Sequence, residues 1–392
     1  MPLPGPYETM LLKIETMSIL PNKLFFIRMI GLVLLVPLCF GCASLKPNPY
    51  DMTEITKPGK NGMIKGELIY PLDHKPTPQC HASTIENTAS GPIAAWFGGT
   101  HEKNPDVGIW VSRLKDGKWS TPIEVANGIQ SESLRYPCWN PVLFQPKSGP
   151  LMLFYKIGPS PREWWGMLTT SDDEGETWSE PVKLGEGPLG PILGPIKNKP
   201  IQLSDGTILC PSSTETKVGE EAFWKVHFES TKDLGKTWQV IGPINDGVAF
   251  DAIQPSILTY ANGNMQILCR TRQNVISQSW SEDGGQSWGK MTPTPLPNPS
   301  AGTDAVTLLD GRQLLIYNHT VRNNPFPAGR AMLNLAISED GKDWRPIMTL
   351  EREEGEFSYP AIIQSPDGLV HITYTYQRQG IKYVLIDPKK LK

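Results

Sequence analysis

The feature that most constrains the fold is a short motif that recurs along the chain. Three copies align without a gap and read Ser/Thr-x-Asp-x-Gly-x-x-Trp, at residues 171–178, 231–238 and 281–288. A fourth copy at 338–344 is one residue shorter, and 116–119 is a degenerate fifth. The five tryptophans are separated by 59, 60, 50 and 56 residues. A period of this length indicates a repeat architecture in which each unit is one supersecondary element.

Each copy of the motif predicts a hairpin turn. Its aspartate can accept hydrogen bonds from the backbone ahead of it, its glycine can adopt a positive φ, and its tryptophan can pack beneath the loop. We therefore interpret the motif aspartates as turn residues; they are Asp173, Asp233, Asp283 and Asp340.

The segments between the turns are short and strand-like, and no long stretch has a sustained helical period. Dividing residues 61–392 by a repeat of about 56 residues gives about six units, each long enough for four strands. The sequence therefore predicts an all-β fold, a six-bladed β-propeller. The 36 Gly and 38 Pro residues are spread along the chain, as a fold with many turns requires.

The charge balance argues against nucleic acid as a partner. The chain has 37 Lys and Arg against 40 Asp and Glu, a net charge of −3, and so lacks the basic excess that binds a phosphate backbone. A P-loop, a dinucleotide fingerprint, a nucleophile elbow and a His-x-x-x-His pair are all absent from the sequence. Because no loop is dense in carboxylates, we predict no metal and no cofactor.

The N-terminal region is typical of an export signal. Residues 29–40 form an apolar stretch that follows Lys23 and Arg28, and it is shorter than the roughly 20 residues that span a membrane. Gly41 directly before Cys42 resembles the processing site of a bacterial lipoprotein.

We therefore expect a signal peptide over 1–42 with cleavage before Cys42, a tether over 43–60 and the propeller over 61–392. The expected location is a bacterial envelope membrane, reached through the lipid on Cys42 alone, or else the periplasm or the medium. The sequence predicts no particular oligomeric state.

Four further cysteines lie in the propeller region, at Cys80, Cys138, Cys210 and Cys269. Their spacings of 58, 72 and 59 residues match neither a zinc motif nor a compact disulfide framework. We expect buried free thiols on strands, because cysteine behaves as a small hydrophobic residue.

The recurring turns resemble the Asp boxes, or bacterial neuraminidase repeats, of the sialidase superfamily, and the resemblance covers nearly all of the chain after its N-terminal region. It implies an exo-acting glycoside hydrolase that removes a terminal acidic sugar from a glycan or glycoconjugate. The substrate's anomeric carbon itself bears a carboxylate, which would repel an anionic nucleophile. The family therefore uses a neutral tyrosine activated by a glutamate, an aspartate acid/base and three arginines that bind the carboxylate.

Several residues match the catalytic pattern that the resemblance implies. Asp106, in the loop after an inner strand of the first repeat, matches the acid/base, with His101 and Glu102 as alternatives. Tyr359, in the segment Glu-Phe-Ser-Tyr-Pro, matches the nucleophile.

Two of the three arginines also have matches. Arg270 matches the second family arginine, with Arg272 as an alternative, and Arg330 matches the third. Other polar and aromatic residues recur where inner strands should reach the central mouth; they include Trp139-Asn140-Pro141, Lys156, Trp164-Trp165, Lys197-Asn198-Lys199-Pro200, Asn298, Asp304 and Tyr317-Asn318-His319.

Two departures from the family pattern concern the substrate acid group and the activation of tyrosine. His81 stands where the first arginine is expected, and it cannot form the bidentate fork that a guanidinium offers a carboxylate. Gln254 stands where the activating glutamate is expected, and it has no basic oxygen. We hypothesise that Glu215 or Glu229 accepts the proton of Tyr359 instead.

These departures leave two alternatives to a sialidase-like hydrolase. One is a hydrolase or lyase for another terminal sugar, such as a uronate- or rhamnose-containing glycan, with His81 or Tyr359 as the base of an elimination. The other is a glycan-binding propeller without catalysis.

Overall fold

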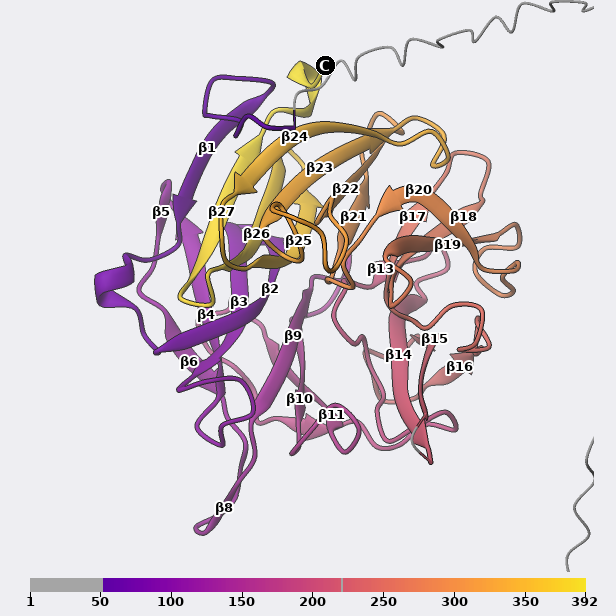
Figure 1. Ribbon diagram of the computed structural model, residues 1–392. Coiled ribbons are helices and arrows are strands. Elements are labelled where there is room, and N and C mark those ends of the chain that lie inside the picture. The colour runs from indigo at the N-terminus through magenta and orange to yellow at the C-terminus, as the bar shows by residue number, and fades with distance from the viewer. Residues whose placement is uncertain (1–51, 220) are drawn as a thin grey trace, which may run out of the picture. The chain divides into compact units, whose positions relative to one another are not determined.

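The computed structural model describes residues 52–219 and 221–392, which form six antiparallel blades around a common centre and one separate two-stranded sheet (Figure 1). The expected signal peptide and lipidation site, Cys42, lie outside the described residues. Within the described residues there is no α-helix, only two short 3-10 turns at Leu72–His74 and Pro388–Lys390. The predicted all-β six-bladed propeller is confirmed.

Most blades consist of four strands, which run in sequence from the inner strand outward. Blade 1 has β2 (Gln79–Thr88), β3 (Gly91–Gly99) and β4 (Gly108–Lys115), with β5 (Lys118–Trp119) and β6 (Ile123–Ala126) both on β4. Blade 2 has β9 (Cys138–Phe144), β10 (Leu151–Ile157), β11 (Trp165–Ser171) and β12 (Val182–Lys183). Blade 3 has β13 (Ile201–Gln202), β14 (Ile208–Val218), β15 (Glu221–Thr231) and β16 (Gln239–Ile241).

The second half of the ring repeats this order. Blade 4 has β17 (Ala252–Thr259), β18 (Met265–Thr271), β19 (Val275–Ser281) and β20 (Thr292–Pro297). Blade 5 has β21 (Asp304–Thr307), β22 (Gln313–Tyr317), β23 (Met332–Ser338) and β24 (Arg345–Arg352). Blade 6 has β25 (Phe357–Gln364), β26 (Val370–Tyr376), β27 (Gly380–Ile386) and β1 (Met63–Leu68).

The outermost strand of blade 6 comes from the other end of the propeller sequence. Strand β1 pairs antiparallel with β27, with Gly66 opposite Val384, so the last blade is completed by the first strand. This pairing closes the ring of blades. The described part of the expected tether, residues 52–60, contacts blade 5, where the Thr56 amide donates to the Thr349 carbonyl at 2.8 Å.

The core lies between neighbouring blades. Strands β9, β10 and β23 are buried at every residue, because each face of a blade packs against the next blade. Leu, Ile, Val and aromatic side chains fill these interfaces. The four propeller cysteines are all buried and free, as expected from their spacing, and all lie on strands.

The recurring motifs form the predicted turns between the third and fourth strands of blades. In residues 231–238, Asp233 Oδ1 accepts from the Thr237 amide at 2.8 Å. Gly235 has a φ of +91° and its carbonyl accepts from Trp238 Nε1 at 2.9 Å. The copies at 171–178 and 281–288 repeat the aspartate bonds.

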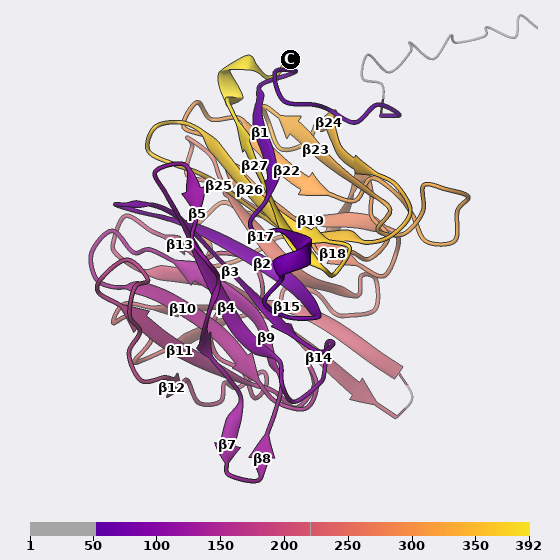
Figure 2. The same cartoon turned by 90° about the vertical axis from the view of Figure 1, so that its left-hand side faces the viewer.

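Because the strands of a blade are antiparallel, the remaining connections lie at the opposite end of the ring from these turns. The links between second and third strands and the links between blades share one end, which we call the mouth. Two hairpins on this end, β14–β15 and β7–β8 (Ile129–Ser131 and Leu134–Arg135), project beyond the other connections (Figure 2). No helix among the described residues is long and apolar enough to cross a membrane.

Candidate functional site

Four inner strands have the same irregularity at the mouth. In β2, β9, β17 and β25 the pairing register shifts across a two-residue interruption, and the first interrupted residue has a positive φ. These residues are Ala82 (+56°), Asn140 (+21°), Gln254 (+58°) and Tyr359 (+50°). A bulge of this kind redirects a side chain and stores backbone strain, which is common at functional sites.

Proline follows the positive-φ residue in three of the four bulges, at Pro141, Pro255 and Pro360. Proline has no N–H group, so it fits a position where the ladder of hydrogen bonds is interrupted. A proline near the start of an inner strand, directly after the positive-φ residue, is therefore a sequence signal for these bulges.

The bulges bring Tyr359, Gln254 and Arg270 together. The phenol oxygen of Tyr359 accepts a hydrogen bond from Arg270 Nη1 at 2.8 Å and lies 3.5 Å from Gln254 Nε2. Arg270 Nη1 is also 3.3 Å from Gln254 Oε1, and Arg270 Nε is 3.3 Å from Ser300 Oγ. The predicted nucleophile, the predicted substrate arginine and the residue in place of the activating glutamate thus share one cluster.

His81 packs against Tyr359, the candidate nucleophile, and lies next to charged side chains. Its ring centroid is 4.3 Å from that of Tyr359, and the side chain is buried. Burial, followed by the positive charge of Arg378, lowers the pKa of His81 well below its ordinary value. His81 is therefore neutral at neutral pH, and its Nδ1 is 3.8 Å from Glu356 Oε1, too far for a hydrogen bond.

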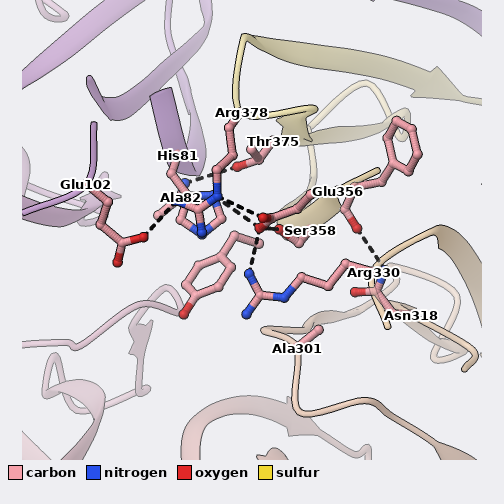
Figure 3. A network of polar contacts seen from close by, with 12 residues as sticks. His81, Ala82, Glu102, Ala301, Asn318, Arg330, Glu356, Ser358, Thr375 and Arg378 are labelled. Carbon is pink, nitrogen blue, oxygen red and sulfur yellow. Dashed lines mark hydrogen bonds and ion pairs between the residues drawn. The ribbon is translucent and has the colours of Figure 1, made fainter. Parts of the chain in front are cut away.

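A network of ion pairs around Glu356 lies beside His81 (Figure 3). Arg330 Nη1 is 2.6 Å from Glu356 Oε1, and Arg378 Nε is 2.7 Å from Glu356 Oε2. Arg378 Nη1 continues the network to Glu102 Oε2 at 2.7 Å. Burial alone would raise the pKa of Glu356, but the interaction with His81, followed by those with Arg330 and Arg378, outweighs burial and holds that pKa well below its ordinary value.

Arg378 is a member of the site that sequence reasoning missed. It lies in the turn between β26 and β27, and its carbonyl accepts a hydrogen bond from the Cys80 amide at 2.8 Å. A guanidinium therefore lies next to His81, although residue 81 itself is not arginine. Nothing local in the sequence around 378 signals this, because the contact joins the last blade to the first.

We predict that replacing Glu356 with Gln lowers the free energy of unfolding by about 2 kcal/mol at neutral pH, between the values for surface and buried ion pairs. Because the pKa of Glu356 is lowered on folding, its stabilisation is fully present above its ordinary pKa and is lost as the pH falls below that value. Denaturant unfolding at about pH 7 and about pH 3 measures this. The difference in free energy of unfolding between wild type and variant should be smaller at the lower pH. An equal difference at both pH values would contradict the ion-pair network.

Asp106 lies in the loop between β3 and β4, the same loop that holds Glu102. Its carboxylate accepts from the Thr100 amide at 3.0 Å and from Thr100 Oγ1 at 2.6 Å, and the residue is exposed. Its carbonyl accepts from Arg135 Nη2 at 2.9 Å. Among the described residues, the structure brings Glu102, and not Asp106, into hydrogen bonding with the arginine network. His101 is exposed at the same loop.

Of the two proposed proton acceptors, Glu215 lies beside the tyrosine cluster. Its Oε2 accepts from Trp224 Nε1 at 3.1 Å. Burial raises the pKa of Glu215, and the charge of Arg270 opposes that rise most strongly. A buried carboxylate with a raised pKa next to Arg270 is a candidate general base.

Glu229 lies in a different environment, inside blade 3. It is fully buried, its Oε1 is 2.8 Å from His227 Nε2, and it also accepts from the Gly194 amide. These partners belong to β15 and to the link between blades 2 and 3. The structure therefore places Glu229 in a buried structural network.

Within the described residues Arg272 forms an ion pair, whereas Arg270 forms none. Arg272 Nη1 is 3.2 Å from Asp251 Oδ2, and its guanidinium stacks on Trp224 at 4.1 Å from the ring centroid. Arg270 also lies over Trp224, at 5.1 Å. Across the described residues, no carboxylate is within ion-pair distance of Arg270, so its charge is available to a ligand.

Positive charge gathers at the mouth around these groups. Burial lowers the pKa of Arg322, and so do the nearby charges of Arg270, Arg272 and Arg330. Together with Arg378, these arginines form a positively charged region beside Tyr359, which favours an anionic ligand. The described part of the chain contains no group of three His, Cys, Asp or Glu side chains that could hold a metal ion.

Comparison with known proteins supports the resemblance to the sialidase superfamily. The family model for a BNR repeat-like domain matches residues 92–372. An anhydrosialidase from Macrobdella decora is 23% identical in an alignment of 225 residues that covers 52% of this chain and 28% of that protein. The chain therefore matches little more than a quarter of this relative.

Solved structures show the same fold at low identity. The Hadza microbial sialidase Hz136 superposes with a TM-score of 0.68 at 18% identity, covering 83% of this chain and 69% of that one. A protein of unknown function from Dyadobacter fermentans superposes with a TM-score of 0.66 at 17% identity, covering 82% and 98%. The NanB sialidase from Streptococcus pneumoniae gives 0.63 at 13% identity, covering 86% and 72%. The resemblance to the sialidase superfamily and the propeller fold are thus confirmed.

Proposed function

The chain belongs to the family of the BNR repeat-like domain, and on that premise we propose that it hydrolyses the bond to a terminal acidic sugar whose anomeric carbon bears the carboxylate. The sialidase-like propeller supports a role in glycan cleavage or glycan binding. The finer proposal rests on one observation, the 2.8 Å contact between the Tyr359 phenol oxygen and Arg270 Nη1.

This contact bears on where the substrate carboxylate can lie. Arg270 has a guanidinium free to bind an anion, and the same guanidinium touches the candidate nucleophilic oxygen. A carboxylate bound there would lie next to the carbon that Tyr359 attacks. Sugars of the sialic acid type meet this condition, whereas a uronate has its carboxylate across the ring oxygen from the anomeric carbon.

The proposed reaction proceeds in two displacements. The Tyr359 oxygen bonds to the anomeric carbon, its proton passes to Glu215, and Asp106 donates a proton to the departing glycosidic oxygen. Water then attacks the anomeric carbon and gives a proton to Asp106, while the Tyr359 oxygen leaves and recovers its proton from Glu215. A neutral phenol avoids repulsion by the substrate carboxylate, and Arg270 stabilises negative charge on the phenol oxygen during both steps.

Asp106 must exchange partners for this role. In the free protein its carboxylate is bonded to Thr100, and the departing oxygen of the substrate would replace that contact. Hydrogen bonds of acid and base groups in a free enzyme commonly form in their reactive geometry only once the substrate is bound. The ion pair of Glu102 with Arg378 holds the same loop at the mouth.

Release of a fluorescent aglycone by purified residues 43–392 tests the proposal. The two substrates are an α-glycoside of sialic acid and a glycoside of glucuronic acid with the same aglycone. We expect release from the first and none from the second. Release from the uronide alone, or an unsaturated product that absorbs ultraviolet light, would support the other hydrolase or the lyase. Calorimetric binding of the sialic acid glycoside by the folded protein without any release would support a glycan-binding propeller.

A further inference from the structure

The link between β12 and β13 contains an unusual buried lysine. Residues 192–198 of this link are buried, although links between strands usually run over the surface. Lys197 is 4% exposed. Burial lowers the pKa of Lys197 to about 7, which reflects the unfavourable removal of its charge from water.

The Lys197 ammonium binds main-chain carbonyls rather than a carboxylate. Its Nζ donates to the Pro360 carbonyl at 2.5 Å and to the Thr303 carbonyl at 2.7 Å. These carbonyls belong to blade 6 and to the link before blade 5, so one side chain joins three parts of the ring. A buried ammonium is destabilising unless its donors are satisfied, and these two carbonyls satisfy Lys197.

One of these bonds is to the residue directly after the candidate nucleophile. Tyr359 has a φ of +50°, which is a strained conformation for a tyrosine, and the strand register is interrupted at Tyr359 and Pro360. Such a conformation persists only when surrounding contacts hold it. Lys197 binds the Pro360 carbonyl within that interruption, and the Lys197 ammonium is 6.0 Å from the Tyr359 ring centroid.

Neighbouring groups hold the strand directly after the bulge. Asp304 Oδ2 accepts from the Ile362 amide at 3.0 Å, and it also binds Lys199 Nζ at 2.9 Å. Asn198 Nδ2 donates to Asp304 Oδ1 at 3.0 Å. The segment from Lys197 to Lys199 therefore fixes the backbone on the C-terminal side of Tyr359.

We propose that Lys197 is a positioning residue that holds the strained bulge at Tyr359 and so directs the phenol oxygen toward Arg270. The inference rests on the proposed function only for its effect on turnover, because the orientation of the tyrosine can be observed without a substrate. Lys197 touches neither the phenol oxygen nor Arg270, so its effect passes through the backbone of Pro360.

The chain offers a matched control in Lys156. Its Nζ is equally buried and donates to three carbonyls, those of Asn140 at 3.0 Å, Pro195 at 2.5 Å and Ile196 at 2.8 Å. Burial lowers the pKa of Lys156 to about 7 as well. Lys156 thus holds the bulge of blade 2 and the same link, but it has no bond to blade 6. A Lys156 variant therefore shows how much turnover and the orientation of Tyr359 change when the link between β12 and β13 is disturbed without loss of a bond to blade 6.

The experiment compares Lys197→Met with Lys156→Met in residues 43–392. The orientation of Tyr359 is followed by the NMR resonance of ring-labelled tyrosine, assigned as the signal that is absent from Tyr359→Phe. We expect this resonance to shift or broaden in Lys197→Met and to stay in place in Lys156→Met. With the sialic acid glycoside, kcat should fall by about 100-fold in Lys197→Met, the loss typical of a small misplacement of a reacting group, with KM changed little. Lys156→Met should lower kcat much less than Lys197→Met does, because Lys156 has no bond to blade 6.

The outcomes separate this inference from the proposed function. A shifted resonance in a protein whose wild type has no turnover would support the positioning role and reject the hydrolase. An unmoved resonance and an unchanged kcat in Lys197→Met, or equal effects in both variants, would overturn the positioning role alone. If Lys197→Met does not fold, Lys197→Gln, which keeps one donor, is measured in the same way. Failure of both to fold would assign Lys197 to general stability and also overturn the inference.

Discussion

Replacing Tyr359 with Phe should reduce kcat for the sialic acid glycoside by about 10³-fold or more, because the change removes the oxygen that bonds to the anomeric carbon. The ring contacts with His81 and the strained backbone at 359 are kept, so the melting temperature should stay close to that of wild type. Steady-state kinetics and thermal unfolding measure the two quantities on the same preparation.

Tyr376→Phe is the matched control for this prediction. Its hydroxyl donates to Glu353 Oε1 at 3.2 Å in an exposed position, so the same chemical change removes a hydroxyl that is not bonded to Arg270. We expect kcat of the control to equal that of wild type. If Tyr359→Phe retained most of its turnover, the phenol oxygen could not be the nucleophile.

Replacing Arg270 with Met should lower kcat/KM for the acidic glycoside by about 10²-fold to 10³-fold, the loss expected when a charge-assisted contact to a substrate anion is removed. Arg270 is in no ion pair among the described residues, so its charge is available to a ligand. Methionine keeps apolar contact with Trp224. Weaker binding of free sialic acid by the variant, measured by calorimetry, provides a second readout.

Arg272→Met separates a specific role of Arg270 from a general effect of positive charge. Arg272 stacks on the same Trp224 but is paired with Asp251. We expect its loss to change kcat/KM by less than about fivefold, as for a charge that is already neutralised. A larger loss in Arg272→Met than in Arg270→Met would reverse the assignment of the substrate arginine.

The fold could be predicted from the sequence because its signal is local and repeated. In residues 231–238, the aspartate, the glycine and the tryptophan each have a position-specific use within one turn, and the structure shows each of them. The spacing of such turns then determines the number of blades. Strand β1 is different, since nothing in residues 63–68 signals that they complete the last blade.

Members of the site could be predicted only where a residue of a suitable chemical type lies within a recognisable local sequence motif. Tyr359, Gln254 and Arg270 are predicted members of one site, and the structure brings them together. Arg378 has no local signal, and Lys197 is predicted only as one of several polar residues near the mouth, because the contacts of both join residues far apart in sequence. Lys197 and Pro360 are 163 residues apart, and Arg378 and Glu102 are 276 apart.

A covalent adduct on Tyr359 would test the central claim most directly. The probe is a sialic acid analogue with a fluorine on the carbon next to the anomeric carbon and with a good leaving group. The fluorine slows both displacements, because it disfavours their positively charged transition states. The good leaving group restores the rate of the first displacement only, so the covalent intermediate accumulates. After incubation and proteolysis, mass spectrometry should find the sugar on the peptide that contains Tyr359, and Tyr359→Phe should remain unlabelled. Turnover of the analogue with the label on a carboxylate such as Glu215, or with no label at all, would contradict the proposed mechanism.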